Sequence, residues 1–298
     1  MKLAVVCLCL AAQAWASLVG DVRAAIAQRD FKKGEALIAA YRAQRGVTSE
    51  MVLALSWLGR GALFARQYDQ ADAYAVETRK LALEMLKSRP LDQEKGLPLA
   101  LGASIEVQAH VMDARGERAS AVDFLRRELA TYRATSIRTR IQKNIHLLSL
   151  EGKPAPPIEK SQDFKGKPAL VFFWAHWCGD CKRQAPSLNR IAAKYGPKGL
   201  VVIGPTQRYG YVARGREAGL DEETAYIEEI RKQFYPMLGS VPVSEDNFKN
   251  WGASTTPTLV LIDRKGIVRL YHPGHMPEEE LEQKVRALLS TSGVTSRL

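Results

Sequence analysis

The chain has 298 residues, of which 46% are hydrophobic and 25% are charged. This balance is typical of a globular protein with room for two ordinary domains, and it argues against a disordered or fibrous chain. The formal net charge of +11 favours anionic partners. However, the basic residues are spread along the chain without a nucleic-acid-binding motif, so we expect a basic surface and no nucleic-acid partner.

The first predicted element is an export signal. Residues 1–16 combine Lys2, an apolar run and the small-x-small sequence Ala14-Trp15-Ala16, a pattern typical of a cleaved signal peptide. An uncleaved anchor is the alternative, but the run is shorter than the roughly 20 residues of a membrane-spanning helix. We therefore expect an extracytoplasmic protein, periplasmic or secreted.

Cleavage of this signal would change the cysteine inventory. The chain has four cysteines, and Cys7 and Cys9 would leave with the signal. The mature protein would then retain only Cys178 and Cys181. Although exported proteins often carry structural disulfides, these two residues would have no partner except each other.

Residues 17–150 are predicted to form an all-helical domain. Apolar residues recur at helical spacing in four segments, at 51–62, 71–85, 101–112 and 122–132. Short polar turns separate the segments, so we expect a series of helical hairpins.

Small residues support the pairing of these helices. Gly34, Ala71 and Ala121 lie in three weakly similar segments, each early in the second helix of a pair, where they allow close approach. The sequence WLGRGALFARQYDQADAY resembles a tetratricopeptide repeat, but the intervals of about 37 and 50 residues differ from the regular 34. We interpret the domain as an irregular, repeat-like array with a possible protein partner. A generic helical bundle is the alternative.

The segment EGKPAPPIEK breaks the helical pattern, which places a second domain at residues 151–298. Strands and helices then alternate, as expected of a compact α/β domain. The expected strands are 168–175, 199–204, 256–263 and 266–272, and the expected helices are 178–195, 221–234 and 277–289.

Cys178 and Cys181 lie where a predicted strand passes into a predicted helix. The free N–H groups and the dipole of a helix N-terminus favour a thiolate, which is the reactive form of cysteine. The second cysteine lies one turn deeper on the same helix face. Cys178 is therefore expected to attack a substrate disulfide, and Cys181 to resolve the mixed disulfide. A closed zinc site would need two further ligands, so we expect no metal and no cofactor.

The region from Gly152 to Leu289 resembles the extracytoplasmic thioredoxin-like proteins of the TlpA/ResA type. Four segments carry the resemblance: GKPAP, GKPALVFFWAHWC, CKRQAP and STTPTLVLID. The resemblance implies a thioredoxin-like fold and a thiol–disulfide oxidoreductase that reduces protein disulfides outside the cytoplasm. It also implies that a membrane-bound electron donor reduces the cysteine pair again after each cycle. It further implies a cis bond before Pro257, beside the cysteines. We assign Trp177, Thr256 and Pro257 to substrate binding, with the Thr256 backbone pairing with an extended substrate segment.

The sequence departs from this family in two ways. Gly179 and Asp180 separate the cysteines, where a proline is more common. Asp180 disfavours a neighbouring thiolate, whereas Lys182 and Arg183 favour it. Phe172 occupies the position of the buried acid of cytoplasmic thioredoxins, so no carboxylate at that position can accept the proton of Cys181.

Two alternative functions are considered. A thiol peroxidase would be expected to have Thr or Ser at position 175, where this chain has Ala175. In a protein-binding scaffold, the helical array would bind the partner and the redox domain would have an auxiliary role.

Of the remaining candidate residues, we expect His176 to be a partly exposed loop residue. Residues 206–223 form either a substrate rim or a solvated insertion.

Overall fold

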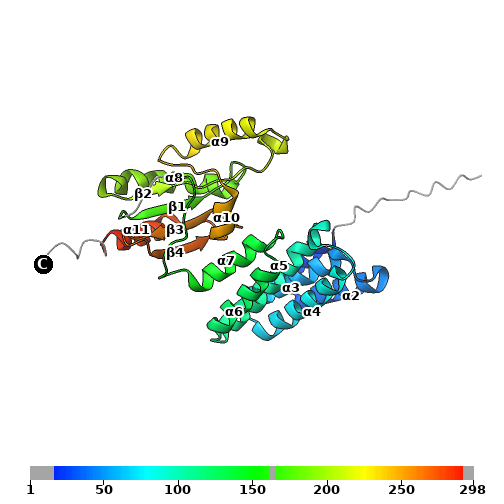
Figure 1. The fold of residues 1–298 in the computed structure, drawn as a ribbon. Helices are drawn as coiled ribbons and strands as arrows, with labels where there is room; N and C mark the ends of the chain where they lie inside the picture. Colours follow the sequence, from blue (N-terminus) through cyan, green and yellow to red (C-terminus); the bar gives the residue numbers. More distant parts are fainter. Residues whose placement is uncertain (1–16, 162–165, 291–298) are drawn as a thin grey trace, which may run out of the picture. The chain divides into compact units, whose positions relative to one another are not determined.

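The computed structural model describes residues 17–161 and 166–290 (Figure 1). The predicted signal, residues 1–16, lies outside them. Contacts divide the chain into two units, with the division between Val111 and Met112. The predicted boundary after residue 150 marks instead where helices give way to mixed structure, and it stays a prediction. Within the described ranges, no helix has the length and apolarity needed to cross a membrane.

The first unit is helical, as expected. It contains four helices and most of a fifth: α1 (Leu18–Ala27), α2 (Phe31–Arg45), α3 (Ser49–Phe64), α4 (Tyr68–Leu86) and α5 (Gly96–Ala114). Polar side chains cap several of them. The Asp30 side chain accepts a hydrogen bond from the Lys33 N–H, and the Thr48 side chain accepts one from the Met51 N–H, which satisfies N–H groups that have no partner within the helix.

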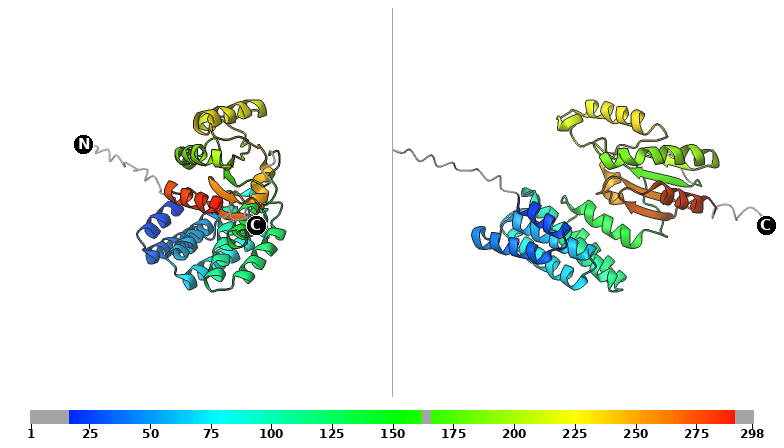
Figure 2. Two further views of the ribbon diagram at one scale, coloured as in Figure 1. Left: turned by 90° about the vertical axis from the view of Figure 1, so that its left-hand side faces the viewer. Right: turned by 180° about the vertical axis from the view of Figure 1, so that it is seen from behind.

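Small residues do lie where helices of this unit approach closely. A Cβ atom on Gly34 of α2 would lie 2.7 Å from Leu58 Cδ2 of α3. Ala71 is fully buried on α4, and α3 and α4 pack side by side (Figure 2). The helical hairpins of the prediction are therefore present in this unit. The likeness to a tetratricopeptide repeat stays a prediction.

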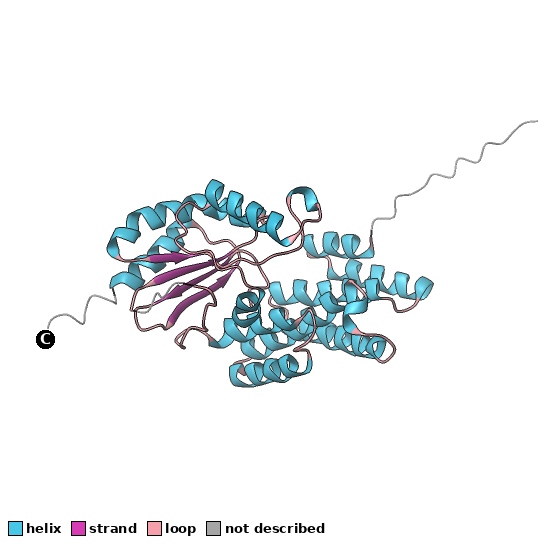
Figure 3. Ribbon diagram, turned by 45° about the horizontal axis from the view of Figure 1, so that its top comes forward, coloured by secondary structure: helices cyan, strands magenta, loops and turns pink. Residues whose placement is uncertain are grey.

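The second unit is built around a four-stranded sheet of order β2-β1-β3-β4 (Figure 3). The central β1 (Ala169–Phe173) pairs in parallel with β2 (Val201–Ile203) and antiparallel with β3 (Thr258–Ile262). β4 (Val268–Pro273) completes a hairpin with β3. All four predicted strands are present, and the expected parallel pairing of the first two is confirmed.

Alternate residues of β1 face opposite layers of the core, because successive side chains of a strand point to opposite faces. The helices that cover the sheet are α8 (Gly179–Tyr195), α9 (Leu220–Phe234), α10 (Glu245–Trp251) and α11 (Glu278–Ser290). Leu170 and Phe172 join the cluster formed with α8, α9 and α11, whereas Val171 and Phe173 join the cluster formed with α10. Every residue of β1 is buried, so the continuous apolar run of the sequence is explained by two covered faces.

Helix α7 (Arg138–Ser149), which follows α6 (Arg118–Thr131), packs directly on the end of α10. His146 Nε2 lies 2.9 Å from the Asn250 carbonyl oxygen. Gly252 ends α10 with a φ of 61°, and a Cβ atom there would lie 2.7 Å from Lys143 Cα and overlap its backbone nitrogen. A glycine is therefore required at this position by both backbone conformation and close approach.

We expect Gly252→Ala to lower the free energy of unfolding of this unit by about 3 kcal/mol. The left-handed conformation costs a non-glycine residue about 1–2 kcal/mol, and overpacking against α7 adds about 1–3 kcal/mol. Urea unfolding followed by circular dichroism measures the loss. Gly266→Ala is the matched control, because Gly266 has a φ of 77° with no atom within 4 Å of the added Cβ. Equal losses in the two variants would contradict a close contact between α7 and Gly252.

Candidate functional site

Cys178 forms the N-cap of helix α8, immediately after the loop that follows β1. Its Sγ accepts a hydrogen bond from the Cys181 N–H at 3.0 Å, and the two residues are joined by a disulfide with a Cα–Cα distance of 5.3 Å. Cys178 is 4% exposed and Cys181 is fully buried. Both cysteines are therefore buried, with Cys178 at the helix start slightly less so than Cys181, the order that exchange with a substrate disulfide requires.

The three residues assigned to substrate binding surround Cys178. The peptide bond between Thr256 and Pro257 is cis, and the Thr256 carbonyl oxygen lies 3.4 Å from Cys178 Sγ. Trp177 is 49% exposed, which is unusual for so large an apolar side chain. These residues are thus brought together although 78 residues separate Cys178 and Thr256. Their roles stay predictions.

Cys181 lies in apolar surroundings. It belongs to the buried cluster that contains Phe172, Trp174 and Leu188. The Phe172 ring packs against Tyr235 at 5.3 Å between centroids, and burial raises the pKa of the Tyr235 phenol. The proton of a reduced Cys181 must therefore leave by a route other than a carboxylate at the position of Phe172.

The charges beside the cysteines largely offset one another. Asp180 forms an ion pair with Arg183 one turn along α8, and both side chains are more than half exposed. Lys182 Nζ lies 5.1 Å from the centre of the Phe234 ring. Because Arg183 shields the Asp180 carboxylate, the helix N-terminus remains the main influence on a Cys178 thiolate.

The prediction of a partly exposed His176 is wrong, because this side chain is fully buried. His176 Nε2 lies 3.1 Å from Glu223 Oε1. Burial lowers the pKa of His176, and the hydrogen bond to Glu223 only partly opposes that effect. A neutral imidazole therefore donates its Nε2–H to the Glu223 carboxylate. A distance of 47 residues separates the pair, so no local sequence signal reveals it.

The same pair anchors the insertion that follows β2. Glu223 also accepts a hydrogen bond from the Gly210 N–H at 3.0 Å. Three tyrosine rings meet the His176 ring edge to face, with centroids 5.3–5.5 Å away: Tyr209, Tyr211 and Tyr226. The insertion is thus packed against the active-site loop, with Tyr209 also contacting the Trp177 ring at 5.4 Å.

Two arginines of the insertion are engaged away from the cysteine site. Arg208 Nε donates to the Thr224 hydroxyl at 3.1 Å, and Arg216 pairs with Glu222 at 2.5 Å. Aromatic residues of the insertion, rather than these two arginines, therefore reach the cysteine site.

In the part of the chain that the structure describes, no group of three or more His, Cys, Asp or Glu side chains is arranged to hold a metal ion.

Comparison with known proteins identifies the second half of the chain. Residues 159–289 match the model of the family described as thioredoxin-like domain. They form a thioredoxin-like domain. The thioredoxin-like protein YneN of Bacillus subtilis is 28% identical over 145 residues, which cover 45% of this chain and 78% of that protein.

Other relatives are named for thiol–disulfide exchange. The thiol-disulfide oxidoreductase ResA of Bacillus thuringiensis is 27% identical over 49% of this chain and 75% of its own length. The thiol:disulfide interchange protein DsbE of Xylella fastidiosa is 28% identical over 48% of this chain and 71% of its own length. A crystal structure of a DsbE from Chlorobium tepidum covers 47% of this chain and 97% of its own length, with 28% identity and a TM-score of 0.38.

We expect the buried His176 to make stability of the thioredoxin-like domain depend on pH. Its folded-state pKa lies below the ordinary value of 6.5, so below about pH 6.5 the unfolded chain binds a proton that the folded state does not, and stability falls by up to about 1.4 kcal/mol per pH unit. His176→Gln removes this contribution, which urea unfolding between about pH 7.5 and about pH 5 measures. His146, whose pKa burial also lowers, contributes separately, and His146→Gln serves as the comparison. An unchanged slope in His176→Gln would contradict a buried neutral imidazole.

We also expect Asp180 and Arg183 to have opposite effects on the reactivity of reduced Cys178, which offset each other in the wild type. Asp180→Asn removes a negative charge beside the thiolate and raises the rate of alkylation by iodoacetamide at neutral pH, because the thiolate is the reacting form. Arg183→Gln exposes the carboxylate and lowers that rate. The double variant returns close to the wild-type rate, and rates that move in the same direction in both single variants would contradict the electrostatic explanation.

Proposed function

We propose that this protein is a thiol–disulfide oxidoreductase that reduces protein disulfides outside the cytoplasm. The observation that carries the proposal is the cysteine pair at the start of α8, with Cys178 at the N-cap and Cys181 fully buried one turn along the helix. Its thioredoxin-like domain and the names of relatives such as ResA and DsbE support the reaction class. The export signal expected at residues 1–16 supports the location.

The reaction begins with the reduced protein. The Cys178 thiolate, which the Cys181 N–H and the α8 N-terminus stabilise, attacks one sulfur of a substrate disulfide. A bond forms between Cys178 and that sulfur, and the other substrate sulfur leaves with the electron pair and takes up a proton. Trp177 and the backbone of Thr256 hold the substrate segment against Cys178 Sγ.

Cys181 then completes the exchange. Its thiolate attacks Cys178 Sγ, the mixed disulfide breaks, and the second substrate sulfur leaves as a thiol after protonation. Two electrons have passed from the cysteine pair to the substrate, which leaves the disulfide present in this structure. A further cycle needs an external dithiol, which we propose is supplied by a membrane-bound electron donor.

The helical unit is the candidate surface for a protein partner. Irregular helical arrays commonly present extended surfaces of this kind. Phe64, at the end of α3, is 91% exposed, and a large exposed apolar side chain is a feature of such surfaces. In this proposal the helical unit directs the redox domain to its substrates.

We expect Cys178→Ser to abolish reduction of insulin disulfides in the presence of a small dithiol reductant. Cys181→Ala keeps the attacking sulfur and loses the resolving one, so it accumulates mixed disulfides with its substrates, which non-reducing gels and mass spectrometry detect. The control is the double variant, which should trap nothing. Insulin reduction that survives in Cys178→Ser would contradict the mechanism, and rapid peroxide consumption by the wild type would favour the peroxidase alternative.

A further inference from the structure

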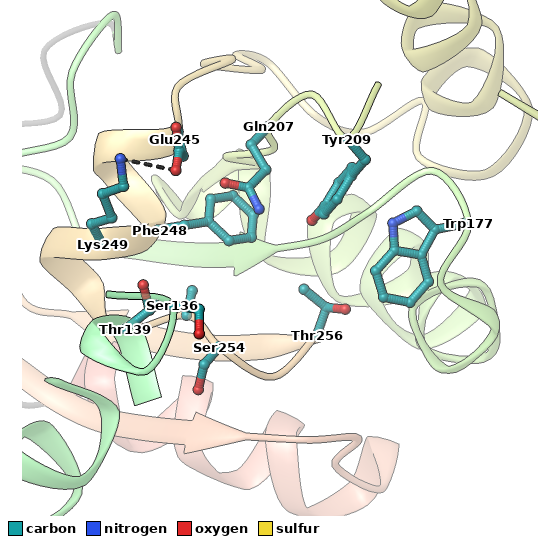
Figure 4. A pocket seen from close by; sticks show the side chains of 11 residues that line it. Ser136, Thr139, Trp177, Gln207, Tyr209, Glu245, Phe248, Lys249, Ser254 and Thr256 are labelled. Carbon is teal, nitrogen blue, oxygen red and sulfur yellow. Dashed lines mark ion pairs between the residues drawn. The ribbon is translucent and has the colours of Figure 1, made fainter. Parts of the chain in front are cut away.

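A groove leads away from the cysteine pair along the surface of the second unit. It has a volume of about 360 Å³, with Trp177 and Thr256 among its lining residues. Figure 4 shows these two side chains and Tyr209 at one end and Thr139 and Lys249 at the other. Because the Thr256 carbonyl lies 3.4 Å from Cys178 Sγ, the end of the groove that Thr256 lines is close to the reacting sulfur.

A second cavity adjoins the groove at the start of α7. This cavity of about 480 Å³ shares Thr139 and Lys249 with the groove and adds Arg133 and Arg138 to the lining. Because they share lining residues, the two cavities form one path from Thr256, which lies beside Cys178, to these arginines.

One wall of the path does not belong to the thioredoxin-like domain. The residues between Arg133 and Thr139 precede the matched region, 159–289. Helix α7 holds this wall in place. It packs so closely against Gly252 that a side chain at that position would not fit, and its His146 contacts the Asn250 carbonyl oxygen. A fixed wall supplied by another part of the chain adds selectivity to the redox site.

The lining of the far end has a net charge of +1, because Arg133, Arg138 and Lys249 outnumber Glu245 and Asp246. Lys249 pairs with Glu245 at 2.9 Å and with Asp246 at 3.7 Å. In contrast, neither Arg133 nor Arg138 forms an ion pair within residues 17–161 and 166–290. Guanidinium groups bind carboxylates through parallel hydrogen bonds, so an acidic side chain is the complement of this end.

We infer that the groove binds an extended segment of the protein substrate and that Arg133 and Arg138 select segments with an acidic residue near the reacting cysteine. The inference rests on the proposed function, since it identifies the substrate class of the same site. The walls formed by Thr139 and Ser254 offer hydroxyl groups to the backbone of the segment, and the arginines distinguish its charge.

The test uses synthetic peptides whose single cysteine carries a 5-thio-2-nitrobenzoate group in a mixed disulfide. Cys178 of the reduced protein attacks the peptide sulfur, coloured thionitrobenzoate leaves with the electron pair, and Cys181 then releases the peptide thiol. A single Glu is moved along both sides of the cysteine in an otherwise neutral sequence, and each peptide has a Gln counterpart. We expect at least one position to give a kcat/KM about three- to fivefold higher with Glu than with Gln at low salt.

Charge variants test which residues cause this preference. In the full chain, Arg133→Gln with Arg138→Gln should bring the Glu-to-Gln ratio close to one, and high salt should do the same in the wild type. The matched control, Arg127→Gln with Lys284→Gln, removes the same charge at two exposed positions outside the groove and should keep the ratio. Because each ratio is measured within one protein, a general loss of activity does not affect it.

A steric variant tests the path itself. Thr139→Trp places a large side chain in the groove and should lower kcat/KM severalfold for all peptides relative to 5,5′-dithiobis(2-nitrobenzoate), a disulfide too small to follow the groove to α7. The companion variant Thr139→Ser retains the hydroxyl and should keep the peptide preference. Equal effects on peptides and on the small disulfide would overturn the path.

The outcomes separate this inference from the proposed function. If the wild type releases no thionitrobenzoate from any peptide, the oxidoreductase proposal fails. If it releases thionitrobenzoate from all peptides but the Glu and Gln series react equally at every position, or if the preference survives loss of both arginines, only the inference about the groove is overturned.

Discussion

The structure of the redox site depends on a sulfur atom that caps a helix. Serine, threonine and aspartate usually fill the N-cap position, because their side-chain oxygens accept a hydrogen bond from the first turn. Here Cys178 Sγ accepts that bond from the Cys181 N–H. The cap and the reacting group are therefore the same atom. Its position is determined by the central strand β1, all of whose residues are buried between the two layers of the core.

Two contacts attach further segments to the sheet and to the loop that carries Cys178. The His176–Glu223 pair joins the active-site loop to the insertion after β2, and Gly252 allows α7 to rest on the end of α10. Neither contact includes a cysteine. Both decide which side chains border the path that starts beside Cys178, because the insertion contributes Tyr209 and α7 contributes Thr139.

Charge is balanced close to the sulfur and unbalanced farther away. Asp180 and Arg183 pair beside the cysteines, so the thiolate is influenced mainly by the helix N-terminus. At the far end of the groove, Lys249 is paired, and the positive charge of Arg133 and Arg138 remains available to a substrate. In our proposal, the chemistry and the selection of substrates therefore belong to different parts of one surface.

The sequence alone determined the elements whose signals are local. The apolar run of β1, the helical stripes and the position of the cysteines at a strand-to-helix junction each occupy a few consecutive residues, so the four strands and the helix that follows Cys178 were predictable. Helix α10, with seven residues, is too short for a periodic signal and was missed. Tertiary structure decided the burial of His176, whose partner lies 47 residues away, and the approach of α7 to the redox site. Contacts of this kind depend on how distant segments pack, and no spacing within the sequence records them.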